Sequence, residues 1–166
     1  MSGVKIEINT VQLSKILNQA MKTLANPKSM FAEMGEELLS IHRIRFLQQQ
    51  SPDGAPWQPL SEEYKQSKRK NRDKILTLDG HLSETLRYQA SNDGVEFGSD
   101  RVYAAIHHFG GSIQPKTAHA LHVGGRFFKN VTIPARPWLG ISEKDQAEML
   151  NIARHHIKNA IKPSNA

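Results

Sequence analysis

Two stretches of helical periodicity, divided by Asn26-Pro27, restrict what the first part of this chain can form. The residue before a proline is disfavoured in the α region, so a helix that begins near Thr10 has to end at this step. Before the step, apolar residues recur at helical spacing, namely Leu13, Ile16, Leu17, Ala20, Met21 and Leu24. After it a second stripe runs to about Gln49, formed by Phe31, Met34, Leu38 and Ile41. This periodicity predicts two long amphipathic helices.

The remainder of the chain carries strand signals and one further helix. Val4, Ile6 and Ile8 alternate with polar residues, as in a short half-buried strand. Residues 85–98 alternate about the turn cluster Ser91–Gly94, and residues 121–133 alternate about Gly124-Gly125, so both segments predict hairpins. Residues 112–120 are polar and hold a proline, which predicts an exposed loop.

The C-terminal part predicts a third long helix. Ser142 and Asp145 resemble a capping box, with Asp in place of the usual Glu. The stripe that follows consists of Leu150, Ala153, Ile157 and Ile161. We therefore expect residues 1–166 to form one α+β domain, in which an antiparallel β-sheet of hairpins packs against two long N-terminal helices and a C-terminal helix. Residues 163–166 are expected to form a frayed tail.

Two short segments contain residues with strong conformational preferences. Pro52-Asp53-Gly54 is turn chemistry, and Trp57 lies between prolines where it can pin the loop onto the second helix. Residues 103–111 combine a helical turn with Gly110 and Gly111, which permit backbone conformations that other residues resist. These glycines would direct residues 112–132 outward as a projecting loop or hairpin. The candidates for a structural motif or an interface are Pro52, Asp53, Gly54, Trp57, Tyr103, His107, Phe109, Gly110, Gly111, Pro134, Arg136 and Pro137.

Basic residues give the chain a formal net charge of +6, within the range that favours solubility. The densest basic run spans residues 65–74, and a charge run of this kind is most often a solvated segment. The alternative is a surface that contacts phosphates or an acidic neighbour. The candidates for such contacts are Lys68, Arg69, Lys70, Arg72, Arg126 and Lys129.

The residue types needed for several kinds of catalysis are not grouped in this sequence. There are no cysteines, and the eight histidines include the adjacent pairs His107-His108 and His155-His156, which point in different directions on a helix. Neither a phosphate-binding glycine loop nor a nucleophile elbow is present. We expect a protein without enzymatic activity, cofactor or metal. No apolar run reaches membrane-spanning length, so no membrane contact is expected.

Taken together, several short motifs resemble the phage virion morphogenesis family, which includes tail-completion and head–tail joining proteins. They occur in the family's order across residues 40–145: Arg45-Phe46, Pro52-Asp53-Gly54, Trp57, Leu60-Ser61, Ile75-Leu76, Gly80, Leu82, Asp93-Gly94-Val95, Gly98, residues 103–107, Phe109-Gly110-Gly111, residues 133–137 and Leu139-Gly140. His108 departs from the family's usual polar residue, and residues 112–132 follow no family pattern.

The resemblance implies a structural protein of the virion tail or neck, made in the host bacterial cytoplasm. Similar proteins form rings, commonly hexameric. The implied partners are further copies of the chain, the tail tube or sheath, and neck or connector proteins, with contact to genomic DNA in the lumen. A basic DNA-binding or regulatory protein is the alternative, and a metal-dependent hydrolase built from the histidines is a third hypothesis.

Overall fold

The computed structural model of this chain describes residues 10–116, 119–123 and 126–161. Its long helices are α1 (Thr10–Ala25), α2 (Lys28–Gln48) and α6 (Glu143–Ile161). Three short helices are α3 (Glu62–Ser67), α4 (His81–Glu84) and α5 (Ala104–Phe109). The strands are β1 (Arg87–Ala90), β2 (Val95–Gly98), β3 (Gly111–Ile113), β4 (Leu121–Val123), β5 (Arg126–Phe128) and β6 (Val131–Ile133). The predicted α+β class is confirmed.

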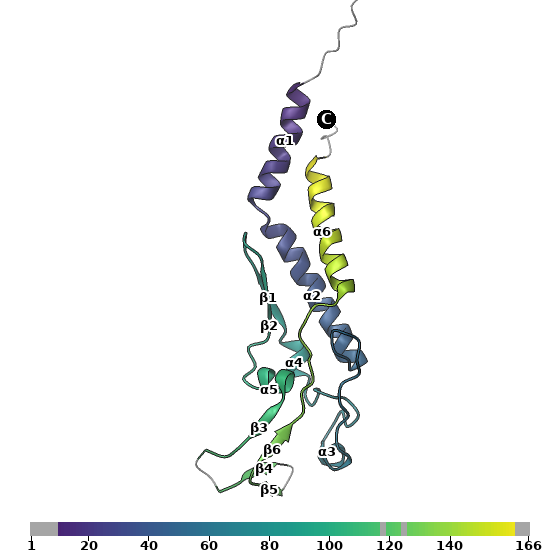
Figure 1. Cartoon of the computed structure of the whole chain (residues 1–166), viewed down its shortest axis with the longest axis vertical. Helices are drawn as coiled ribbons and strands as arrows, with labels where there is room; N and C mark the ends of the chain where they lie inside the picture. Colours follow the sequence, from purple (N-terminus) through teal and green to yellow (C-terminus); the bar gives the residue numbers. More distant parts are fainter. Residues whose placement is uncertain (1–9, 117–118, 124–125, 162–166) are drawn as a thin grey trace, which may run out of the picture.

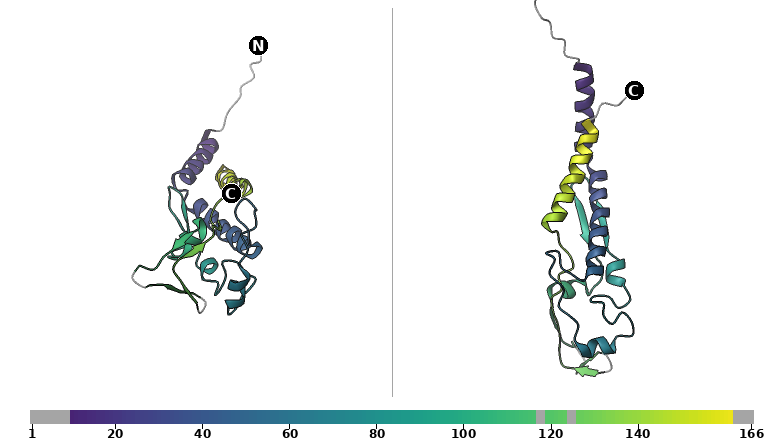
Figure 2. Two further views of the ribbon diagram at one scale, coloured as in Figure 1. Left: turned by 60° about the horizontal axis from the view of Figure 1, so that its bottom comes forward. Right: turned by 90° about the vertical axis from the view of Figure 1, so that its right-hand side faces the viewer.

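The molecule is elongated, with α1 and the end of α6 at one extremity and β4 and β5 at the other (Figure 1). The right-hand view in Figure 2 shows the same arrangement. Helix α2 forms the central axis and continues from α1 after the break at Pro27. Helix α6 packs against both α1 and α2. The predicted division of the N-terminal half into two helices at Asn26-Pro27 is therefore confirmed.

The strands form three separate two-stranded antiparallel ladders, β1–β2, β3–β6 and β4–β5, where the sequence suggested one sheet. The first predicted hairpin is confirmed, since Arg87 pairs with Gly98 and Ala90 with Val95. This ladder packs on α2. The second predicted hairpin is confirmed in part, because Leu121 pairs with Phe128.

The prediction of an exposed loop at residues 112–120 is wrong at its beginning. Ser112 pairs with Thr132 and Ile113 with Val131, so the chain leaves α5 directly into a strand. Strands β3 and β6 are each three residues long and lie far apart in the chain. A short strand of this kind carries too few residues to show a period of two.

The core lies where α2, α4, α5 and the β1–β2 ladder meet. Its buried members are Phe46, Trp57, Ile75, Leu82, Leu86, Ala104 and Trp138. Phe46 contacts the Trp57 ring edge-on, with ring centroids 5.2 Å apart, and the Trp138 ring at 6.3 Å. The predicted packing of Trp57 against the second helix is confirmed. Burial of each indole stabilises the fold by several kcal/mol, since truncation of a buried Trp costs about 3–5 kcal/mol.

The predicted stripe of the last helix does not face the core. Leu150 is 56% exposed, Ile157 38% and Ile161 46%. The side of α6 that is covered carries Asp145 and Ala160 instead. The predicted strand at residues 4–8 and the predicted tail at 163–166 lie outside the described residues. Among the described helices, none is long and apolar enough to cross a membrane.

Candidate assembly surfaces

The segment 134–140 holds the middle of the molecule together, because its residues from Arg136 to Gly140 form hydrogen bonds to α2, α5 and the 51–60 loop. The backbone N–H of Arg136 donates to His107 O at 2.9 Å. Its buried guanidinium donates through Nε to Gln58 O at 2.8 Å and through an Nη to Pro59 O at 3.2 Å. Arg136 therefore binds α5 and the 51–60 loop at once, and its role as a structural residue follows from these contacts.

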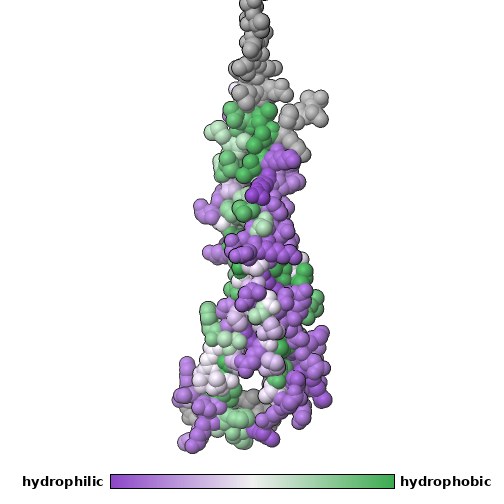
Figure 3. All heavy atoms as spheres, turned by 45° about the vertical axis from the view of Figure 1, so that its right-hand side comes forward, coloured by the Kyte–Doolittle hydropathy of each residue, from purple (hydrophilic) through white to green (hydrophobic). Residues whose placement is uncertain are grey.

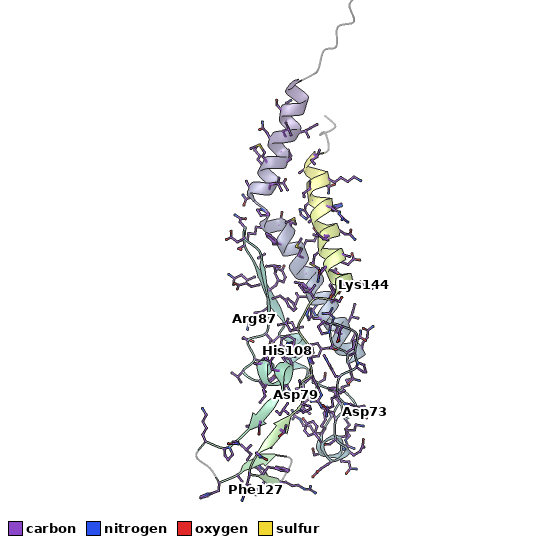
Figure 4. All side chains as sticks on the ribbon, viewed as in Figure 1. Asp73, Asp79, Arg87, His108, Phe127 and Lys144 are labelled. Atoms are coloured by element: carbon purple, nitrogen blue, oxygen red, sulfur yellow. The ribbon has the colours of Figure 1, made fainter. Side chains whose placement is uncertain are left out.

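Both tryptophans extend this network through their indole N–H groups. Trp57 Nε1 donates to Pro137 O at 2.8 Å, and Trp138 Nε1 donates to Ala104 O at 3.0 Å. His108 Nδ1 accepts from Trp138 N at 3.3 Å and from Leu139 N at 3.4 Å. Figure 4 shows His108 near the middle of the long axis. Residues distant in sequence are thus joined by buried or partly buried hydrogen bonds, and such bonds are costly to leave unmade.

The turn at Gly110 requires glycine for two reasons. Its φ is 73°, in the region that favours glycine, and a Cβ built there would lie 2.7 Å from Ala135 N. Gly140 makes a similar close approach, since its added Cβ would lie 2.8 Å from Pro52 Cγ. The predicted motif residues Gly110 and Pro52 therefore mark places where two backbone segments are packed against each other.

A buried polar cluster joins α2 to the start of α6. Arg45 donates to an Asp145 carboxylate oxygen and, at 2.6 Å, to Gly140 O. His42 Nδ1 donates to Leu38 O at 2.7 Å, and its Nε2 accepts from Gly140 N at 3.4 Å.

Burial lowers the pKa of His42, and this helps keep the ring neutral next to Arg45. Burial opposes ionisation of Asp145, but bonds from Ser142 and the charge of Arg45 outweigh it and lower the pKa of Asp145.

The capping box predicted for the last helix is confirmed and belongs to this cluster. Ser142 N donates to Asp145 Oδ2 at 2.7 Å, and Asp145 N donates to Ser142 Oγ at 3.2 Å. Asp145 therefore caps the N-terminus of α6 and also accepts a hydrogen bond from the Arg45 guanidinium. Sequence reasoning identified the cap but missed His42 and Arg45, because polar residues on an amphipathic helix are expected to face water.

The structure places Lys68 inside the chain, and its prediction as a residue that faces DNA or a partner is wrong. Its side chain is buried, and Nζ donates to Asn71 O at 2.6 Å, to Lys74 O at 2.6 Å and to Thr77 O at 3.0 Å. The ammonium group thus binds three backbone carbonyls of the 68–78 loop and stabilises the conformation of this loop. The sequence of a basic run does not indicate which of its residues is buried, and in the run 65–74 only Lys68 is buried.

Several other predicted basic residues bind acceptors within the chain. Arg69 and Lys70 contact Asp79 at 2.5 Å and 2.8 Å. Arg72 Nε donates to Lys68 O at 3.0 Å, and Arg126 pairs with Glu63. Lys129 is exposed. The six residues therefore do not form one positive surface.

Apolar side chains are exposed at both ends of the molecule. At the α1 end Leu17, Met21 and Leu24 are more than half exposed, and Figure 3 shows hydrophobic side chains gathered over this helix. At the opposite end Phe127 is 76% exposed, and Figure 4 shows it at the tip farthest from α1. Phe109, a predicted motif residue, is also exposed, as are Tyr103, Asp53, Gly54, Gly111 and Pro137.

A cleft of about 1060 Å³ lies between the β3–β6 ladder and the α3 region. Its lining includes Leu60, Leu76, Ile113 and Phe128, and also His107. His107 Nδ1 is buried and has no hydrogen-bond partner within the described part of the chain. Within that same part, no group of three or more His, Cys, Asp or Glu side chains could hold a metal ion.

Comparison with known proteins identifies the class to which this arrangement belongs. The model of the phage virion morphogenesis family matches residues 8–158, and the chain belongs to this family. A role in the assembly of phage particles follows from this membership.

A named relative supports the same conclusion. The chain is 26% identical to "Putative capsid assembly protein G" of Escherichia phage Mu, and the match covers 96% of each chain. No solved structure matches the chain. The resemblance inferred from the short motifs is confirmed at the level of the family.

Proposed function

We propose that this chain is a structural subunit that completes the phage tail or joins the tail to the head, and that it acts as part of a homo-oligomeric ring at the tail terminus or neck. The observation that carries the proposal is the distribution of exposed apolar side chains over an elongated molecule. Leu47 is 79% exposed, Phe109 76% and Phe127 76%, in addition to the apolar residues of α1 and α6. Exposed apolar surface of this extent is typical of proteins that are covered by partners.

The hydrogen bonds in the middle of the molecule support the proposed role as a ring subunit. Residues 136–140 connect α2, α5 and the 51–60 loop through buried and partly buried hydrogen bonds. Helix α2, helix α5 and the 51–60 loop are therefore held in a fixed relation to one another. A subunit of this kind can contact its neighbours in the ring and the tail tube, sheath, neck or connector proteins along the particle axis.

Contact with genomic DNA in the ring lumen is a further part of the proposal. Among the basic residues named from the sequence, Lys129 is exposed, and Arg69, Lys70 and Arg126 are largely exposed although they are paired. Exposed pairs contribute little stability and can exchange partners. The alternative function, a DNA-binding regulator, would have to use these same four residues, since Lys68 is buried and Arg72 donates to a carbonyl of its own loop.

Deletion of the gene from the phage genome that encodes the chain tests the proposed function. We expect filled heads and separate tails that do not join, visible by negative-stain electron microscopy, and recovery of infectious particles when the chain is supplied from a plasmid. Normal yields of infectious particles after deletion would contradict the proposal. Absence of heads would also contradict it, because it would assign the chain to head formation.

A double variant of the chain tests the lumen contact separately. Lys129→Glu with Arg69→Glu is expected to assemble normally but to lower the yield of DNA-filled particles, with Lys129→Gln and Arg69→Gln as the matched neutral control. Equal yields from the charge-reversed and neutral variants would exclude a role of these side chains in DNA contact.

A further inference from the structure

The cleft between the β3–β6 ladder and the α3 region has a free strand edge along one wall. Strand β6 pairs with β3 on one side, and among the described residues no third strand joins this ladder. Residues 130–134, which include all of β6, line the cleft in unbroken succession. Because successive side chains of a strand point to opposite faces, such a run shows that the cleft follows the outer edge of β6. The unpaired backbone groups of that edge therefore face the cleft.

The side chains beside this edge alternate in character. Val131 and Ile133 share one face of β6 and are half-buried, whereas Thr132 on the other face is exposed. Leu60 and Leu76 add apolar surface to the lining. The cleft volume of about 1060 Å³ lies at the upper end of the range of about 300–1,000 Å³ found for small-molecule sites. A free strand edge inside an apolar cleft of this size is suited to an extended peptide that adds as a further strand.

The chain contains a segment with the pattern that this edge requires. Val4, Ile6 and Ile8 alternate with Lys5 and Glu7, so an extended backbone over these positions has one apolar face and one charged face. Residues 4–8 lie outside the described residues. A strand needs a neighbouring strand to pair its backbone N–H and C=O groups, and the alternation therefore predicts a sheet edge to which this segment binds.

The ladders of the same copy are out of reach of this segment. Residue 4 is six residues from Thr10, where α1 begins, and six extended residues span at most about 20 Å. Helix α1 has 16 residues and is about 24 Å long by its rise per residue. All three ladders lie beyond the end of α1, and the cleft lies beyond α2 as well (Figure 1). Residues 4–8 can therefore reach a cleft of this kind only in another copy.

We propose that residues 4–8 of a second copy of this chain bind in the cleft and add to the outer edge of β6 as a third strand. The apolar face of the added strand lies on the side of Val131 and Ile133, and its charged face lies on the side of Thr132. Backbone hydrogen bonds hold the strand at the edge, and burial of its three apolar side chains in the cleft supplies the hydrophobic contribution.

This contact joins opposite ends of neighbouring copies. Residues 4–8 precede α1 at one extremity of the molecule, whereas β6 and the cleft lie toward the other (Figure 1). Each copy therefore has one strand to donate and one edge to accept a strand. Heterologous contacts of this kind generate a ring when the rotation between copies closes. The inference deepens the proposed ring and rests on the proposed function only for the place of that ring in the virion.

Cross-linking of the full chain tests the position of the added strand. The chain has no cysteine, so introduced thiols are the only ones present. One chain carries Ile6→Cys and a tag that increases its size, and a second carries Val131→Cys, or Ile133→Cys for a register shifted by two residues. Mild oxidation of the mixture should give a disulfide-linked product with one copy of each chain on a non-reducing gel.

Lys5→Cys is the matched control for this experiment. Its side chain would lie on the opposite face of the added strand from Val131, whereas a disulfide requires Cβ atoms about 3.5–4.5 Å apart. We therefore expect the mixed product to be lost when Lys5→Cys replaces Ile6→Cys. Equal amounts of product from the two variants would overturn the proposed strand.

Light scattering tests the contribution of the segment to assembly. We expect the wild-type chain to have a mass of more than one copy and Ile6→Asp to have a lower mass, because the substitution places a charge in the apolar cleft. Lys5→Asp, on the charged face, should keep the wild-type mass. Far-ultraviolet circular dichroism should show wild-type helix content for both variants. An Ile6→Asp chain with the wild-type mass would contradict the proposal.

Two further results would overturn the proposal. A chain with both Ile6→Cys and Val131→Cys that forms a disulfide only within itself would show that each copy fills its own cleft. A wild-type chain that is monomeric at every concentration would show that the cleft binds a different protein. These measurements use purified protein, so they are independent of the particle counts that test the proposed function.

Discussion

At the scale of single residues, two motif positions of this family, Trp57 and Arg136, serve the interior of the chain, whereas others such as Phe109 are exposed. Arg136, Trp57 and Trp138 are buried, and each satisfies a backbone carbonyl from a distant segment. Arg45 and Asp145 form a buried ion pair between α2 and α6. Removal of one partner of such a pair leaves an uncompensated charge, which makes these positions sensitive to substitution.

The turn at Gly110 gives the first prediction. Gly110→Ala is expected to lower the free energy of unfolding by about 1–3 kcal/mol, because alanine is strained at positive φ and its Cβ meets the backbone at Ala135. Gly98→Ala is the matched control, since an added Cβ there meets no atom within 4 Å. Urea unfolding of both variants measures the difference. Equal stability of the two variants would contradict the requirement for glycine at position 110.

The buried ammonium of Lys68 gives the second prediction. Lys68→Met keeps the apolar stem but leaves three carbonyls without their donor, and each buried unsatisfied group costs about 1–3 kcal/mol. We expect lower stability and faster cleavage of the 68–78 loop in limited proteolysis. Lys70→Met, which removes an exposed pair with Asp79, should behave like the wild-type chain. Rapid cleavage in both variants would assign the effect to lost surface charge instead.

At the scale of elements, the start of α6 combines a local and a tertiary interaction. The capping box between Ser142 and Asp145 is local, and it was predictable because the spacing of three residues is fixed by helix geometry. The contact of Asp145 with Arg45 joins positions far apart in sequence, and no local pattern indicates it. The same carboxylate therefore has one role that the sequence predicts and one that it does not.

These two roles give the third prediction, an order of stability among variants. Ser142→Ala removes one cap bond and should cost about 1 kcal/mol. Asp145→Ala also leaves Arg45 buried without its partner and should cost about 3–5 kcal/mol. Ser40→Ala, at an exposed site on α2, is the control and should be close to neutral. Thermal unfolding measures the order, and equal losses at 142 and 145 would contradict a stabilising ion pair.

At the scale of the whole molecule, three histidines couple stability to pH. Burial lowers the pKa values of His42, His107 and His108 from their ordinary value of 6.5, and Arg136 also lowers that of His107. The unfolded chain therefore binds more protons than the folded chain below about pH 6.5, so stability falls as the solution is acidified. The carboxylates with lowered pKa values, such as Asp145, lose their contribution only as pH falls below about 4.

The fourth prediction follows because the histidines and the carboxylates affect stability in different pH ranges. The free energy of unfolding in urea should decrease steadily between pH 7 and pH 5, and the decrease should be smaller in His42→Gln than in the wild-type chain. His119→Gln, at an exposed position, should retain the wild-type pH dependence. A stability that is constant or rises on acidification over this range would show that these histidines do not stay neutral in the folded chain.

The sequence by itself determined the three long helices, the first hairpin, the α6 cap and the family. Helical periodicity, the break at Asn26-Pro27 and the turn at Ser91–Gly94 act over a few residues, and short-range geometry is visible in a linear pattern. The ordered motifs that indicated the family are confirmed by its match to residues 8–158. That the chain forms a ring at the tail or neck stays a prediction.

Only the tertiary structure decided which side of each helix is covered and which charged groups are buried. The stripe of α6 predicted the helix but not its exposure, because periodicity shows that a helix has an apolar face without showing what packs on it. Lys68 and Arg45 turn inward because backbone carbonyls and a carboxylate from elsewhere in the fold surround them. Such contacts depend on segments that meet only after folding.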